Sequence, residues 1–319
     1  MGSTFTLSQG GLASLLCLSA VGAICEPILS GRTQAQSRGV YPLGMSAINS
    51  GITPDPGFTY SNQLIFYSRD QAKANDGSRL PLMGSNSVLM DLNSLIWVSS
   101  KSFLGGAHYS AIATLPVAKN DLTSDIHGNI SGGSGFADSY YVPFVLGWNK
   151  ERAAFRAIYG FLAPTGRFVA GANNNVGSGY WTHALSSGQT FYLTKARQWA
   201  ISAFEMYEFH TTQEGTSTHP GETFDLDYSV LRTLAFGSGA TLLQLGAVGY
   251  NQRQTTATTG PTITREQSNE RYAVNAIGFA SNLNFPNRRL SLSVKFFDEF
   301  ANRATFQGFS LQVLGGVHF

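Results

Sequence analysis

Charged residues are scarce in this sequence, and long apolar runs are missing from most of it. Only 13% of the 319 residues are charged, whereas soluble domains carry about 25% charged residues. No uninterrupted apolar run of about 18 residues follows the N-terminal stretch, which argues against helices that span a membrane. The formal net charge is +2 and no basic run occurs, so nothing indicates nucleic acid as a partner.

Cysteine is also nearly absent, since the chain has only Cys17 and Cys25. Both lie in a segment that resembles a secretory signal, with an apolar core at 12–24 and small residues near position 35. No Lys or Arg precedes this core, and the alternative is an ordinary first helix. Cleavage after Ala35 would leave a chain without thiols, as suits an oxidising compartment. The sequence therefore predicts a signal peptide over 1–35 and export.

The next segment, 36–58, is too rich in helix and strand breakers to form a long regular element. Residues 38–57 contain three prolines and four glycines. We expect a periplasmic lead-in before the first strand, although the sequence leaves open whether this segment plugs a lumen.

The end of the chain reads as a strand with one apolar face. Counting back by twos gives Phe319, Val317, Gly315, Val313, Leu311 and Phe309, and side chains at that spacing share one face of a strand. An apolar strand that ends in a terminal Phe resembles the C-terminal signal of bacterial outer-membrane β-barrels. The resemblance implies that Phe319 is an assembly signal and that the barrel-assembly machinery is a partner.

Residues 59–319 contain periodic segments that fit twelve strands. The segments are 59–69, 87–100, 106–115, 138–148, 153–162, 179–193, 198–211, 222–235, 240–253, 269–283, 290–300 and 305–319. Short and longer connections alternate between them, as expected where short turns face the periplasm and long loops face outside. The sequence predicts an all-β protein, a transmembrane antiparallel up-and-down β-barrel of about 12 strands.

Several motifs resemble one family of outer-membrane proteins, the phenol-degradation meta-pathway family. The resemblance begins in 38–70, with FTYSNQLIFYSRD at its end, and continues in YVPFVLGW at 141–148 and APTGRF at 163–168. It implies a channel or transporter in the Gram-negative outer membrane for small hydrophobic solutes, with aromatic ones suggested by the family name. No cofactor is implied, and outer-membrane lipids would surround the barrel. The shared motifs are structural, so they specify architecture better than substrate.

Polar residues inside the predicted strands are the candidates for a substrate path. A basic residue exposed to hydrocarbon at the midplane costs about 2–4 kcal/mol, so we expect these side chains to face the lumen. The set comprises Asp91, Asn93, Arg156, Glu205, Asp227 and Lys295. They either line a path for solute or form a structural ion-pair network that fills a narrow barrel.

One pair of residues offers an enzymatic alternative. His108 and Ser110 share a strand face, where an imidazole could take the hydroxyl proton, as in outer-membrane lipid hydrolases. The ordinary interpretation is a lumen His beside a Ser. The histidines show no metal-binding spacing, and a third alternative is a structural barrel without transport. We predict a protein without catalytic residues, metal or cofactor.

Overall fold

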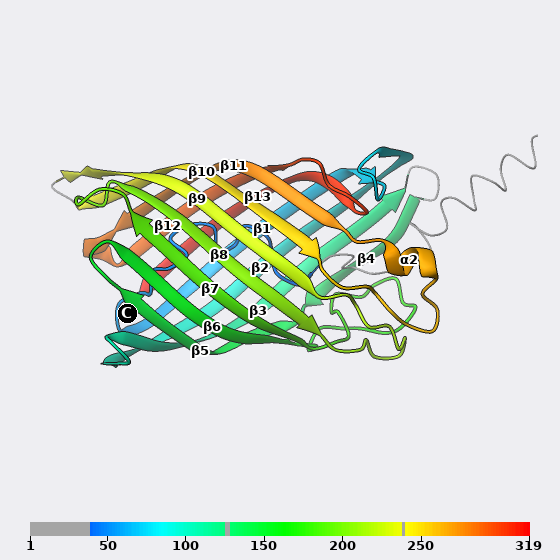
Figure 1. Ribbon diagram of the computed structural model, residues 1–319, viewed down its shortest axis with the longest axis horizontal. Helices are drawn as coiled ribbons and strands as arrows, with labels where there is room; N and C mark the ends of the chain where they lie inside the picture. The colour runs from blue at the N-terminus through cyan, green and yellow to red at the C-terminus, as the bar shows by residue number, and fades with distance from the viewer. Residues whose placement is uncertain (1–38, 125–127, 238–239) are drawn as a thin grey trace, which may run out of the picture.

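The chain folds into a closed antiparallel β-barrel of 12 strands (Figure 1). The computed structural model describes residues 39–124, 128–237 and 240–319. The barrel strands are β1 (Gly57–Lys73), β2 (Arg79–Phe103), β3 (Ala107–Ser124), β5 (Ser139–Asn149), β6 (Ala153–Ala163), β7 (Thr182–Tyr192), β8 (Trp199–His210), β9 (Thr223–Phe236), β10 (Thr241–Gln254), β11 (Ala273–Phe285), β12 (Leu290–Glu299) and β13 (Phe306–His318). Strand β1 pairs with both β2 and β13, which closes the barrel. The predicted fold class is confirmed.

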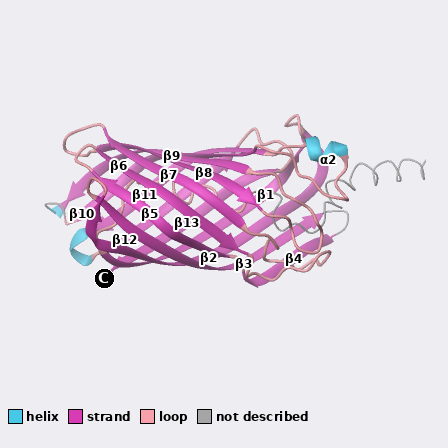
Figure 2. Ribbon diagram, turned by 60° about the horizontal axis from the view of Figure 1, so that its bottom comes forward, coloured by secondary structure: helices cyan, strands magenta, loops and turns pink. Residues whose placement is uncertain are grey.

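The two ends of the barrel differ in their connections. Short turns and the C-terminus lie at one end, and the long loops with α2 (Arg265–Asn269) lie at the other (Figures 1 and 2). A 3-10 turn, η2 (Pro286–Arg288), joins β11 to β12. Among the described residues, no helix is long and apolar enough to cross a membrane.

An additional strand, β4 (Gly128–Phe136), lies where the sequence predicted a loop over 116–137. It pairs with the part of β3 from Val117 to Ser124, beyond the segment His108–Thr114 that pairs with β5. The sequence of β4 is rich in glycine and reads as a turn. Its strand conformation comes from the hydrogen bonds that the long edge of β3 supplies.

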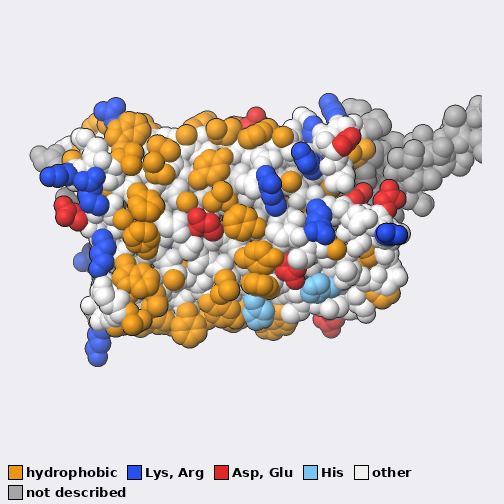
Figure 3. All heavy atoms as spheres, in the orientation of Figure 1, with side chains coloured by type: hydrophobic (Ala, Val, Ile, Leu, Met, Phe, Trp, Pro, Cys, Tyr) orange, Lys and Arg blue, Asp and Glu red, His pale blue; other side chains and the backbone are white. Residues whose placement is uncertain are grey.

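Apolar side chains cover the outer wall, and Lys and Arg side chains gather toward the two ends (Figure 3). On β12, Leu292 and Val294 are exposed, whereas Ser293 and Lys295, which alternate with them, are buried. This period of two places alternate residues toward lipid and toward the lumen. The outer surface therefore has the apolar band that a bilayer requires.

Residues 39–56 run through the inside of the barrel, and we call this segment the plug. Gly39 contacts Tyr272 near the long-loop end, whereas Thr53 contacts Asn149 near the short-turn end. The plug is visible as the blue coil behind the front strands in Figure 1. The sequence left open whether the lead-in plugs a lumen, and residues 39–56 lie inside the barrel. The predicted signal peptide, 1–35, lies outside the described residues.

Glycine allows the plug to approach the wall closely near the short-turn end. A Cβ atom added at Gly51 would lie 2.1 Å from the Ala154 carbonyl oxygen. A Cβ atom added at Gly188 on β7 would lie 2.1 Å from the Ser50 carbonyl oxygen. Backbone meets backbone at both places, so a larger residue at either would push the plug from the wall.

Candidate functional site in the plugged lumen

Asp227 on the inner face of β9 holds the turn of the plug. Its Oδ2 atom accepts hydrogen bonds from the Tyr41 hydroxyl at 2.5 Å and the Ser46 amide at 3.0 Å. Its Oδ1 atom accepts one from the Gly44 amide at 2.9 Å. Asp227 is fully buried, and a buried carboxylate requires such donors because it has lost its water.

Lys295 on β12 binds the same turn of the plug. It carries the opposite charge to Asp227 and donates hydrogen bonds where Asp227 accepts them. Its ammonium donates to the carbonyl oxygens of Gly44 at 2.6 Å and Met45 at 2.7 Å. The Gln312 amide on β13 donates to the Leu43 carbonyl at 2.7 Å. Both hydrogen bonds of the Lys295 ammonium thus go to the plug backbone.

The part of the plug near the short-turn end is bound by a third charged residue. Arg156 on β6 donates through Nε to the Ser50 carbonyl at 2.6 Å. The Asn49 side chain donates to Gln244 Oε1 on β10 at 2.8 Å. Arg156, Asp227 and Lys295 thus all lie on the inner face, where the sequence placed them, and all three contact the plug.

Apolar contacts between plug and wall accompany these hydrogen bonds. The Tyr41 ring stacks on Phe204 of β8 with ring centroids 5.5 Å apart, and Leu43 and Ala47 are buried. The cluster around them includes Met206, Leu231, Val248, Tyr250, Val274 and Phe297. The plug therefore covers an apolar cluster on an inner wall that also carries many polar side chains.

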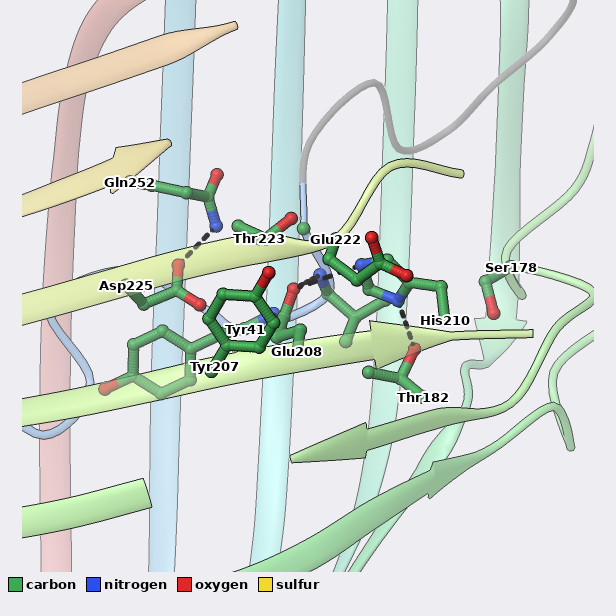
Figure 4. A network of polar contacts seen from close by, with 12 residues as sticks. Tyr41, Ser178, Thr182, Tyr207, Glu208, His210, Glu222, Thr223, Asp225 and Gln252 are labelled. Carbon is green, nitrogen blue, oxygen red and sulfur yellow. Dashed lines mark hydrogen bonds and ion pairs between the residues drawn. The ribbon is translucent and has the colours of Figure 1, made fainter. Parts of the chain in front are cut away.

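The beginning of the plug contacts a second acidic group that the sequence analysis did not select. Glu208 on β8 accepts hydrogen bonds from the amides of Val40 and Tyr41, at 3.1 and 2.7 Å. Asp225 and Gln252 lie beside it on β9 and β10 (Figure 4). Asp225 could have been found from the sequence, because it shares a strand face with Asp227.

Four tyrosines near the long-loop ends of the strands also lie inside. Tyr180, Tyr250 and Tyr272 are buried, and Tyr140 packs against the inner cluster. The hydroxyl of Tyr272 accepts from the Gly39 amide at 2.6 Å. Position near a strand end does not reveal which face a tyrosine occupies, and here the plug provides partners on the inner face.

The predicted inward orientation of Asp91 and Asn93 is wrong. They share the outer face of β2 with Leu89, Leu95 and Trp97, which are exposed. The inner face of β2 is apolar because Leu92, Val88 and Met90 pack in a cluster with Met45 of the plug. On the outer face, Asp91 accepts a hydrogen bond from Asn62 Nδ2 at 2.5 Å. The Tyr60 hydroxyl donates one to the Asn93 side chain at 2.6 Å.

Glu205 also faces outward, contrary to the prediction. It alternates on β8 with the buried Phe204 and Met206, and its Oε2 accepts from Ser187 and Gln189 on β7, both at 2.9 Å. Glu205 lies six residues from Trp199, a rise of about 15 Å through the membrane for a strand with ordinary tilt. The hydrogen bonds from these cross-strand donors reduce the free-energy cost of placing a carboxylate at that depth in the membrane.

The suggested hydrolytic pair is not assembled. His108 Nδ1 lies 2.8 Å from the Ser99 carbonyl oxygen, and no hydrogen bond joins His108 to Ser110 within the described ranges. The described residues also contain no group of three or more His, Cys, Asp or Glu placed to hold a metal ion.

Comparison with solved structures shows the same barrel fold in proteins of the outer membrane. The COG4313 outer membrane channel from Pseudomonas putida F1 superposes with a TM-score of 0.70 at 14% identity, covering 88% of this chain and 100% of that one. The β domain of the Bordetella autotransporter BrkA gives a TM-score of 0.53 at 13% identity, covering 83% and 100%. No curated protein sequence is significantly similar. The sequence profile of one family matches residues 69–314, and the chain therefore belongs to the family described as "Putative MetA-pathway of phenol degradation".

Proposed function

We propose that this protein is an outer-membrane channel through which small hydrophobic compounds, aromatic ones among them, enter a Gram-negative cell. The family description and the printed name of the Pseudomonas putida channel support this proposal. The observation that carries it is the apolar cluster of the inner wall under the plug, where Tyr41 stacks on Phe204 and Leu43 is buried. Withdrawal of the plug would expose a surface suited to hydrophobic solutes.

The inner residues then have two roles. Arg156, Asp227 and Lys295 hold the plug closed through its backbone groups and border the path once the plug has moved. Residues such as Leu231 and Phe297 supply apolar contact to the solute. The function needs no cofactor, and Asp91, Asn93 and Glu205 lie outside the path.

The membrane partners follow from the outer surface. The apolar band in Figure 3 would contact outer-membrane lipids. The barrel-assembly machinery would recognise Phe319, which follows β13. Export by a cleaved signal peptide remains part of the proposal.

A reversible lock on the plug tests the proposed path. Cysteines at Asn49 and Gln244, whose side chains are hydrogen-bonded at 2.8 Å, would be joined by a short bifunctional methanethiosulfonate in a chain with Cys17 and Cys25 replaced by Ser. Entry of the neutral aromatic dye N-phenyl-1-naphthylamine would be followed in cells with an intact lipopolysaccharide leaflet. We expect the link to slow entry and a reductant to restore it, while each single-cysteine variant is unaffected.

Unchanged dye entry in the locked protein would show that the solute does not pass the plug. The hydrolase alternative has a separate test, because Ser110→Ala should abolish release of fatty acid from phospholipid if Ser110 is a nucleophile. We expect the purified protein to release none, and Ser110-dependent release would overturn the assignment as a channel.

A further inference from the structure

In the long-loop half of the lumen, two buried acceptors have no hydrogen-bond donor among the residues that the structure describes. Asp225 Oδ1 accepts from Gln252 Nε2 at 2.6 Å. Within the described part of the chain, Asp225 Oδ2 and Gln252 Oε1 have no hydrogen-bond partner, although both residues are fully buried. An unpaired acceptor in that position costs free energy, and a carboxylate costs more than an amide. Figure 4 shows the two side chains meeting between β9 and β10.

Acidic side chains are concentrated around these acceptors. Glu208, Asp225 and Asp227 are all fully buried on the inner faces of β8 and β9. Lys295 donates to plug carbonyls, and His210 Nε2 lies 3.6 Å from Glu208 Oε2. A cation with several N–H donors would complement this group in both charge and hydrogen bonding.

The beginning of the plug occupies part of the same space, and it does so with N–H donors. Val40 and Tyr41 donate their amides to Glu208, and Gly39 donates its amide to Tyr272. A Cβ atom at Gly39 would lie 2.3 Å from Glu208 Oε2 and 2.9 Å from Gln252 Nε2. Residues 39–41 therefore lie directly against the acidic group.

Apolar surface adjoins the acidic group on the side toward the membrane centre. Met206 is opposite Asp225 in the β8–β9 ladder, and Val248 is opposite Ser229 in the β9–β10 ladder. Both belong to the buried cluster that contains Tyr41 and Leu231. A ligand with its cationic head at Asp225 could place an alkyl or aromatic body along this wall.

We propose that Glu208, Asp225 and Gln252 form a binding site for the primary ammonium head of an amphiphilic solute. An ammonium group has three donors, enough to pair Asp225 Oδ2 and Gln252 Oε1 and to replace a plug amide at Glu208. Binding of the head and withdrawal of residues 39–41 are thus coupled, because both use the Glu208 carboxylate. This inference rests on the proposed channel function and adds a preference among its solutes.

Titration calorimetry of the full-length protein in nonionic micelles at pH 7 tests the proposal, with heats from empty micelles subtracted. The probes are n-decylamine, which is protonated at this pH because alkylammonium pKa values lie near about 10, and n-decanol. We expect the amine to bind about tenfold tighter than the alcohol. Asp225→Asn should remove this preference, while Glu205→Gln, which removes a carboxylate from the outer wall, should retain it.

Equal affinity for amine and alcohol in the native protein, or an unchanged preference in Asp225→Asn, would overturn the site. If Asp225→Asn does not reach the heat-modifiable folded form, Gln252→Leu removes one unpaired acceptor without changing the charge. It should weaken amine binding severalfold and leave binding of the alcohol unchanged, and retained amine affinity in it would also overturn the site. Because dye entry tests the channel with a neutral compound, failure at Asp225 and failure of the proposed function are distinguishable.

Discussion

Phe204 and Glu205 are adjacent in β8 and lie on opposite faces of the barrel wall. Phe204 is 4% exposed and stacks on Tyr41 of the plug. Glu205 lies among lipid-facing residues and accepts hydrogen bonds from Ser187 and Gln189. The sequence predicted that Glu205 faces the lumen, and in the folded protein its side chain faces the membrane.

Cysteine substitution at these two positions tests the orientation of β8. A lipid-soluble maleimide should label Glu205→Cys in intact membranes and spare Phe204→Cys, because only position 205 contacts the bilayer. Labelling is measured by mass spectrometry. Folding of both variants is first verified by the change in their electrophoretic mobility on heating. The opposite pattern would mean that the register of β8 is displaced by one residue.

Tyr41→Phe should loosen the plug without unfolding the barrel. The substitution removes the hydroxyl that donates to Asp227 and that accepts from the Ser46 amide at 2.9 Å. A hydrogen bond to a buried charge contributes about 2 kcal/mol, so the open fraction should rise about 30-fold. Planar-bilayer conductance measures this change. Tyr207→Phe is the matched control, since its hydroxyl contacts Thr255 on the outside; equal conductance in both variants would contradict the role of Tyr41.

Acidification should loosen a contact between two long loops. Burial alone would raise the pKa of Glu222, but hydrogen bonds from Thr256 and contact with His219 lower it below its usual value of 4.5. A lowered pKa in the folded state contributes stability above pH 4.5, and this contribution is lost as the pH falls through the folded value. The effect should stay below about 1 kcal/mol because the pair is near the surface.

Amide hydrogen exchange measures that loop contact directly. The Thr255 amide donates to the Glu222 carbonyl at 2.8 Å, and its protection should decrease between pH 5 and pH 3 after correction for intrinsic rates. Glu222→Gln is the control, and its protection should not depend on pH in this range. Equal pH dependence in both proteins would assign the effect to another group.

Deletion of Phe319 should impair assembly. The side chain is 67% exposed, so its loss removes little packing energy, and the predicted effect comes from recognition during assembly. The measured quantity is the fraction of protein in the heat-modifiable form in outer-membrane fractions. Phe319→Tyr keeps an aromatic terminus and should assemble normally, and normal assembly of the deletion variant would refute the signal.

The strands could be predicted because the alternation of apolar and polar residues is a local property of the sequence. On β9 and β12 one face is polar, so the faces could also be assigned, and Asp227 and Lys295 lie where the pattern placed them. On β2 the same rule failed, because Met45 of the plug makes an apolar inner face favourable. Alternation separates two faces, and the identity of the inner face depends on what fills the lumen.

The plug itself could not be predicted from local sequence. Its contacts join residues far apart in the chain, as with Tyr41 and Asp227, which are separated by 186 positions. Proline and glycine excluded a long helix or strand over 38–57, but the same composition suits an exposed linker. Only the donors and acceptors of the assembled wall determine that this segment lies inside.

The close backbone fit at Gly51 and Gly188 has a consequence for the order of events during biogenesis. The plug precedes β1, and β1 meets β13, the last strand of the chain, to complete the ring. Sliding the segment lengthwise into a finished ring would force larger residues past the contacts at Gly51 and Gly188, which leave no room for even a methyl group, whereas lifting the plug off the wall to open the path would not. Laying it sideways into the open ring meets no such obstacle. The ring should therefore close around the plug, with residues 39–56 already in place when β13 pairs with β1.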